Sequence, residues 1–175
     1  MEILIPADRI RERVDELGAE IATDFDGRPI TVVGVLTGCL IFLADLIRRL
    51  SHPTQVALLQ ASSYRGTATT AGRLDIHDEL LPDLTGHHVL VLDDILDTGQ
   101  TISRIVDHLK AKGAASVRTC VLLRKIGRQQ VAFEPDYAGF PIPDKFVVGY
   151  GLDFNGLYRH LPFIAVLPEL PATEA

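Results

Sequence analysis

The chain has 175 residues, of which 47% are hydrophobic, and a formal net charge of −6 at pH 7. This length and apolar content predict one domain, residues 1–175, with a substantial core, and the surplus negative charge gives no electrostatic reason to bind nucleic acid. No apolar run approaches the roughly twenty residues that span a bilayer, and the N-terminus lacks the cationic start of a secretory signal, so we expect a cytoplasmic protein without a membrane partner. The two cysteines, Cys39 and Cys120, fit reduced thiols better than a disulfide framework or a zinc site.

The first part of the chain predicts two helices alternating with two strands. A helix begins just after Pro6, and a strand follows over residues 31–36. After a turn at residues 37–39 comes a second helix, and residues 56–61 then form the next strand. The apolar stripes of the two helices are Ile10, Val14, Leu17 and Ile21, and then Leu40, Leu43, Ala44, Ile47 and Leu50.

The middle of the chain contains a polar segment and then a strand, a loop and a helix. Residues 65–77 are rich in Thr and Gly and show neither periodicity, which predicts a mobile loop or a weak hairpin. Residues 89–92 form a short apolar run typical of a strand buried on both faces, and Asp93 and Asp94 close it. A polar turn over residues 97–101 leads into a helix that ends before Gly113.

The last part predicts two further strands. Residues 117–123 form a fourth core strand and residues 146–148 a fifth, while the Pro- and Gly-containing residues 133–143 between them connect the two. Strands and helices therefore alternate along most of the chain. This alternation predicts an α/β fold with a central parallel sheet flanked by helices.

The strand, acids and turn at residues 89–101 predict a site for a phosphorylated sugar. In an open α/β sheet, ligands bind at the carboxyl ends of the strands, where the amides of a helix N-terminus attract an anion. A phosphate would lie in the 98–101 loop, and Asp93 and Asp94 beside it suit a sugar diol or a hydrated Mg²⁺. The alternative is that the turn only caps the helix and ends the strand.

The thirteen residues 89–101, reading VLVLDDILDTGQT, resemble the phosphoribosyl diphosphate signature of the type I phosphoribosyltransferases. Other matching pieces follow in the family's order: residues 33–46, 61–64 and 143–162, the last reading PDKFVVGYGLDFNGLYRHLP. Within that group the chain is similar to the bacterial hypoxanthine-guanine phosphoribosyltransferases. The last piece is the most specific, because the central signature is shared with transferases that act on other bases.

This resemblance implies a small hood, formed by the chain ends, over the base site, with a base-binding tail at about residues 143–170. It implies transfer of a phosphoribosyl group from phosphoribosyl diphosphate to hypoxanthine or guanine in purine salvage, with release of pyrophosphate. Mg²⁺ would be the cofactor, and the subunits would form a homodimer or a homotetramer. A flexible loop at about residues 63–77, starting at Ser63 and Tyr64, would close over the site during turnover.

The resemblance also implies roles for individual residues around the sugar. The 5′-phosphate would bind Thr98, Gly99, Gln100 and Thr101, and Asp93, Asp94 and Asp153 would support Mg²⁺. Asp97 would accept a proton from the purine, although a helix N-cap is the alternative for this residue. Leu36, Thr37 and Gly38 would form the pyrophosphate loop together with Arg159, with a cis peptide between Leu36 and Thr37. Many relatives have Lys or Arg where this chain has Thr37, so a cation is absent there.

The purine would bind residues of the tail and one lysine. Phe146 would stack on the purine, and the backbone of Val147 and Asp153 would bind its edge, next to Lys145. Lys125 would donate to the 6-keto oxygen; since lysine has donors only, adenine, with an amino group there, should be rejected. The alternatives are core packing for Phe146 and a solvated surface charge for Lys125.

Two other functions stay open. A transferase of the same fold could prefer xanthine or another base. Measuring the turnover of each purine would distinguish such an enzyme from one that prefers hypoxanthine and guanine. A regulatory relative could sense phosphoribosyl diphosphate or a nucleotide and bind RNA or DNA, but the acidic balance of the chain and its Asp97 speak against this.

Overall fold

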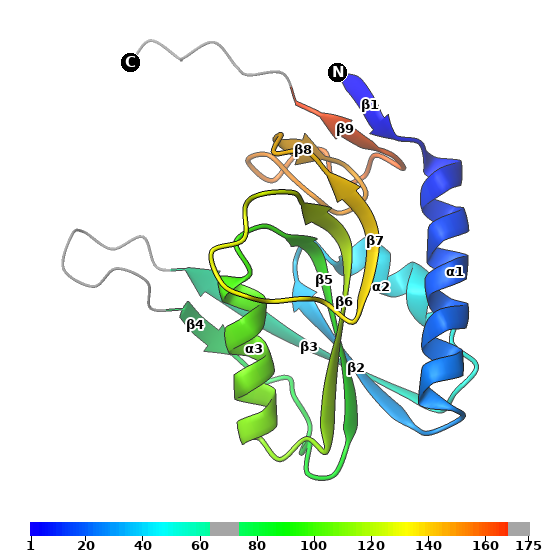
Figure 1. Cartoon of the computed structure of the whole chain (residues 1–175), viewed down its shortest axis with the longest axis vertical. Coiled ribbons are helices and arrows are strands. Elements are labelled where there is room, and N and C mark those ends of the chain that lie inside the picture. The colour runs from blue at the N-terminus through cyan, green and yellow to red at the C-terminus, as the bar shows by residue number, and fades with distance from the viewer. Residues whose placement is uncertain (64–73, 168–175) are drawn as a thin grey trace, which may run out of the picture.

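The computed structural model describes residues 1–63 and 74–167. They form a large sheet in the order β4-β3-β2-β5-β6-β7 and a small one in the order β1-β9-β8, which lies near one end of the large sheet (Figure 1). Within the large sheet all neighbours are parallel except β4, which joins β3 antiparallel. Its strands are β2 (Ile30–Leu36), β3 (Thr54–Ser63), β4 (Leu74–His77), β5 (His88–Leu96), β6 (Ser116–Lys125) and β7 (Tyr137–Ile142).

The central strand β5 is longer than the sequence predicts. Its pairing with β2 stops at Leu92, opposite Gly34, as expected for a strand closed by two acids. On its other side the pairing with β6 continues, with Asp93 opposite Val121 and Ile95 opposite Leu123. Asp93 and Asp94 therefore do not end the strand but lie in it, because β6 extends beyond β2 and fixes their backbone.

The prediction of a fifth core strand at residues 146–148 is wrong. These residues give β8 (Val147–Val148), which pairs with β9 (Ile164–Val166), and β9 pairs with β1 (Glu2–Ile5), both antiparallel. The edge of the large sheet is instead β7, inside the segment predicted to be a connection. Gly139 and Pro141 of β7 are unfavourable in the interior of a strand, so the sequence does not predict one here, but an edge strand tolerates both residues. The small sheet of both chain ends confirms the hood.

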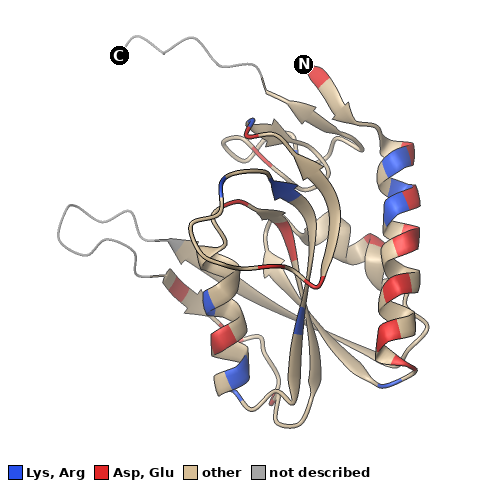
Figure 2. Ribbon diagram, in the orientation of Figure 1, with Lys and Arg blue, Asp and Glu red and all other residues tan. Residues whose placement is uncertain are grey.

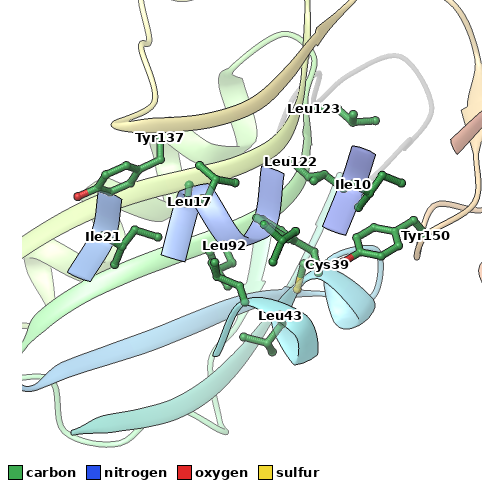
Figure 3. Close-up of a cluster of buried hydrophobic side chains, with 14 of the residues drawn as sticks. Ile10, Leu17, Ile21, Cys39, Leu43, Leu92, Leu122, Leu123, Tyr137 and Tyr150 are labelled. Carbon is green, nitrogen blue, oxygen red and sulfur yellow. The ribbon is translucent and has the colours of Figure 1, made fainter. Parts of the chain in front are cut away.

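Helices cover both faces of the large sheet. Helix α1 (Ala7–Phe25) begins after Pro6 and buries its predicted stripe. Together with α2 (Leu40–Ile47) it covers the face toward which Val32 and Leu92 point (Figure 3). Helix α3 (Gln100–Ala111) buries its apolar side against the opposite face. Strand residues alternate between these two cores, as the pleat of a sheet dictates.

Some predictions differ in detail or fall partly outside the described residues. Helix α2 ends at Ile47, before the predicted Leu50. For residues 74–77 of the predicted loop or hairpin, the antiparallel pairing of β4 with β3 favours the hairpin. Tyr64 and residues 65–73 lie outside the described residues. Cys39 and Cys120 are free and buried, and no described helix is long and apolar enough to cross a membrane.

Candidate active site

A cavity of about 310 Å³ opens at the carboxyl ends of β2 and β5. Its floor is a pair of neighbouring acids on β5, and its sides are the turn after β2, the turn before α3 and the segment that follows β8. Most of the predicted site residues line it: Leu36, Thr37, Gly38, Asp93, Asp94, Asp97, Thr98, Gly99, Thr101, Asp153 and Arg159. The fold thus brings residues from three separate stretches of the chain, 36–38, 93–101 and 153–159, to one place.

Asp93 and Asp94 lie side by side in a poorly solvated position. Desolvation, and then the charge of Asp94, raise the pKa of Asp93 well above its ordinary value. Desolvation also raises the pKa of Asp94, while hydrogen bonds and the positive charge of Arg159 act in the opposite direction. Two carboxyls that are hard to ionise together provide a place where an added cation would be strongly stabilised.

The turn before α3 is built to present backbone amides. Gly99 is the N-cap of the helix and has φ of 82°, a left-handed conformation that glycine adopts without strain. A Cβ on it would come within 2.9 Å of the Val131 side chain. The Thr98 carbonyl accepts a hydrogen bond of 2.9 Å from the Gln130 amide, which fixes the turn from outside. The first amides of α3 have no partner within the helix, and that of Gln100 donates to Thr98 Oγ1 at 3.4 Å.

The turn after β2 packs directly on the acids. Its Leu36–Thr37 peptide is cis, as the resemblance implies. A Cβ on Gly38 would overlap the Asp94 carboxyl, and one on Gly151 would overlap the Gly38 carbonyl. The backbone therefore approaches the acids as closely as it can, and only glycine fits at Gly38.

Arg159 is the one cationic residue that lines the cavity among residues 1–63 and 74–167. One guanidinium nitrogen donates to the Gly151 carbonyl at 2.6 Å, and the other lies 2.7 Å from an Asp153 oxygen. The second Asp153 oxygen accepts the Gly156 amide at 2.7 Å. These contacts fix both side chains opposite the β5 acids.

Asp97 belongs to a network of charges that sequence reasoning missed. Its carboxylate lies 2.9 Å from Arg128 Nε and 3.7 Å from Lys125 Nζ. Asp144 contacts the same two cations, at 3.6 Å from Arg128 and 3.1 Å from Lys125. Arg128 follows β6 by a few residues in a polar turn, and nothing in the sequence marks its approach to Asp97. Since Gly99 is the N-cap, Asp97 is not, which removes the alternative given for it.

The residues predicted for the purine lie outside the cavity lining, apart from Asp153. Phe146 is 54% exposed, so it is not a core residue, and it meets Phe154 edge to face at a centroid distance of 5.7 Å. Val147 is buried in β8, and Lys145 is exposed beside it. The Lys125 side chain is only 13% exposed. Lys125 is therefore not a solvated surface charge, which was the alternative interpretation of this residue.

Two further predicted residues also lie outside the lining. Gln100 is exposed at the start of α3 and donates to Gln130 at 2.7 Å rather than facing the cavity. Ser63 ends β3, where its backbone pairs with Leu74. The remaining lining residues are apolar and were not predicted as part of the site. They come from β2, β3, α3 and the end of β5, where Ile95 and Leu96 directly follow the acids: Val35, Ala61, Ile95, Leu96 and Ile102.

An open, mainly parallel sheet with a phosphate-type helix turn beside paired acids is the arrangement of a phosphoribosyltransferase. The family described as the phosphoribosyl transferase domain matches residues 6–155. The chain therefore belongs to the phosphoribosyltransferases and, by the relatives that follow, to their hypoxanthine-guanine branch.

The chain is similar to proteins of that branch over nearly its whole length. It is 39% identical to the hypoxanthine-guanine phosphoribosyltransferase of Streptococcus pneumoniae over 168 residues, which are 96% of this chain and 93% of that protein. A crystal structure of the enzyme of the same name from Bacillus anthracis superposes with a TM-score of 0.90 at 38% identity, covering 95% of this chain and 98% of that one. The chain is also 41% identical to the bifunctional protein TilS/HprT of Listeria monocytogenes, with 97% of this chain covered, but it spans about a quarter (26%) of that protein's length.

Proposed function

We propose that this chain transfers the 5-phosphoribosyl group of phosphoribosyl diphosphate to hypoxanthine or guanine, giving IMP or GMP and pyrophosphate. The relatives named for this activity support the proposal. The observation that carries it is the cavity itself, where a helix N-terminus, two adjacent acids and a partly exposed arginine line one space. These are the groups needed to hold a monoester, a ribose and a departing diphosphate.

The 5′-phosphate would bind the turn of Thr98, Gly99 and Thr101. The amides at the N-terminus of α3 and the two threonine hydroxyls offer donors, and the helix dipole favours the negative charge. Gln100 would contribute its backbone only, because its side chain is held by Gln130.

Asp93 and Asp94 would hold Mg²⁺ and the ribose hydroxyls, and Asp153 would support a second Mg²⁺. Carboxylate oxygens suit this hard cation, and a cation would stabilise the charge of two acids whose pKa values burial raises. Among the described residues no three acids, histidines or cysteines converge into a complete metal cage. These acids would hold the cation together with water, and the chemistry it would supply is neutralisation of the charge of the leaving group.

The leaving pyrophosphate would meet the turn of Leu36, Thr37 and Gly38. Thr37 brings no charge, so Arg159 would supply the positive charge on this side, at a position fixed by Gly151 and Asp153. As the sugar carbon becomes electron-poor, these groups would stabilise the departing oxygens.

The purine would lie between Asp97 and the tail. Asp97 would accept the ring proton as the new bond forms, and Arg128 Nε, 2.9 Å away, would orient its carboxylate. Lys125, next to Asp97, would donate to a 6-keto oxygen, Phe146 would cover the ring, and Lys145, Val147 and the Asp153 backbone would border its edge. The loop that starts at Ser63 and Tyr64 would exclude water, and the subunits would form a homodimer or a homotetramer in the cytoplasm.

The test is to incubate each of a panel of purines with the protein, phosphoribosyl diphosphate and Mg²⁺, and to measure the rate of nucleotide formation. We expect hypoxanthine and guanine to react at least about a hundredfold faster than adenine, because Lys125 offers donors only. A dominant rate with xanthine would replace the proposal by the alternative transferase. No reaction with any base, together with salt-sensitive binding of RNA or DNA, would favour the regulatory alternative.

A further inference from the structure

A second cavity, of about 440 Å³, lies between α1, α2 and the segment after β8. The groups that line it are unusual for a chain of net charge −6, because four are arginines. We propose that this cavity is a second, metal-independent binding site for a small polyphosphate or phosphorylated metabolite. Its polar lining consists of Arg11, Asp45, Arg48, Arg49, Tyr150, Arg159 and His160.

The positive charge of the cavity is not cancelled within it. Asp45 is its one acidic residue, and this carboxylate is shared between Arg48 and the Tyr150 hydroxyl, which donates to it at 2.6 Å. Arg49 pairs with Asp15, which does not line the cavity. Arg159 likewise pairs with Asp153, which lies outside this lining. Three of the four arginines therefore have carboxylate partners, and the positive charge left for an anion is that of Arg11.

Arg11 is the residue that points most clearly to a ligand. It is exposed on α1 and forms no ion pair or side-chain hydrogen bond with any residue in the described part of the chain. Its helix neighbours Arg9 and Arg13 both pair with glutamates. Basic residues gather in the N-terminal half of α1, and acidic ones dominate toward its C-terminal end (Figure 2).

The chemistry of the lining narrows the ligand class. Guanidinium groups present planar pairs of donors that match phosphate oxygens, and several of them around one space suit more than one phosphate charge. Val14, Ile41, Leu161 and Pro162 add an apolar part to the wall, against which a sugar or base could pack. The cavity has no carboxylate pair like that of Asp93 and Asp94, so binding here needs no divalent cation.

The second cavity is separate from the first but shares one wall with it. Arg159 lines both, and Gly151 packs between the Gly38 carbonyl of one and the Ile41 side chain of the other. Variants that test the second site must therefore leave Arg159 unchanged. Arg11 and Arg48 are suitable, because both are exposed and line only the second cavity.

The experiment is isothermal titration calorimetry of the full chain with inorganic pyrophosphate in EDTA, where the acid pair of the first cavity repels the probe. We expect one site on the unchanged protein and at least tenfold weaker binding for the double variant Arg11→Glu, Arg48→Glu. The control, Arg9→Glu with Lys110→Glu, makes the same change in net charge at two exposed helix positions outside the cavity. It should bind as the unchanged protein does.

Three results would overturn the proposal. The first is the absence of metal-free binding to the unchanged protein, and the second is equal weakening by the control, which would show a general charge effect. The third is a change of molar mass of the Arg11→Glu, Arg48→Glu variant in light scattering, which would show that a second copy of the chain covers the cavity. Retained circular dichroism and thermal midpoint would show that this variant is folded.

Discussion

Asp97→Asn removes the proposed proton acceptor while it changes little else. A positioned general base contributes about 10²–10⁴-fold in rate, which is about 3–5 kcal/mol of the barrier. The amide keeps an oxygen that can accept from Arg128 Nε, now 2.9 Å away. The ion pair that is lost joins two partly exposed side chains, 38% and 43% exposed, so its loss costs at most about 1 kcal/mol of folding free energy.

The assay is steady-state formation of IMP and GMP, with the thermal midpoint measured on the same samples. We expect kcat to fall by 10²–10⁴ with a small change in KM, and the thermal midpoint to move by only a few degrees. Asp144→Asn is the matched control, since Asp144 contacts the same Lys125 and Arg128 but does not line the cavity. A kcat within about fivefold of the unchanged enzyme, or an equal fall in both variants, would refute the role of Asp97.

Three further predictions concern the core, the cavity and the response to pH. Leu17→Ala removes a side chain that is 0% exposed and should lower the free energy of unfolding by about 2–5 kcal/mol in urea titrations; a loss below about 1 kcal/mol would contradict the described core. Gly38→Ala should weaken binding of phosphoribosyl diphosphate at least tenfold by calorimetry, because its Cβ would overlap the Asp94 carboxyl, whereas Gly27→Ala, with open space around it, should bind normally. Burial, followed by the hydrogen bond to Asp24, raises the pKa of Tyr137 from 10.0 to about 12, so its contribution to stability is complete below pH 10 and is lost as the pH rises to about 12. The stability advantage over Tyr137→Phe should therefore shrink by up to about 3 kcal/mol across that window in urea titrations, and a constant difference would exclude this coupling.

The elements that the sequence predicts well are those with a strong local signal. The stripe of α1 and the apolar runs of β2, β5 and β6 follow directly from their side-chain periods. The edge strand β7 has no such signal, since Gly139 and Pro141 interrupt it and only its place at the sheet edge makes it a strand. Val147 and Val148 have a strand signal, but two apolar residues cannot indicate which of two sheets they join.

The candidate site shows the same limit. Asp93, Asp94 and the turn to Thr101 are contiguous, so their common position at a strand end could be predicted from spacing alone. The pairing of Arg128 with Asp97 bridges two different loops, and no spacing encodes it. Likewise Asp93 lies in a paired strand because the pairing of β5 with β6 continues past the point where its pairing with β2 stops. The sequence of β5 by itself does not show how far each neighbouring strand pairs with it.

Titration calorimetry with phosphoribosyl diphosphate in the presence and absence of Mg²⁺ tests the central claim most directly. If the cavity at the ends of β2 and β5 binds the activated pentose through its acids and the α3 turn, the Arg11→Glu, Arg48→Glu variant, which lacks the proposed second site, should bind one molecule with Mg²⁺ and at least tenfold more weakly without it. Asp94→Asn should abolish most of that difference. Absence of binding in Mg²⁺, or binding that is indifferent both to the ion and to Asp94, would contradict the account.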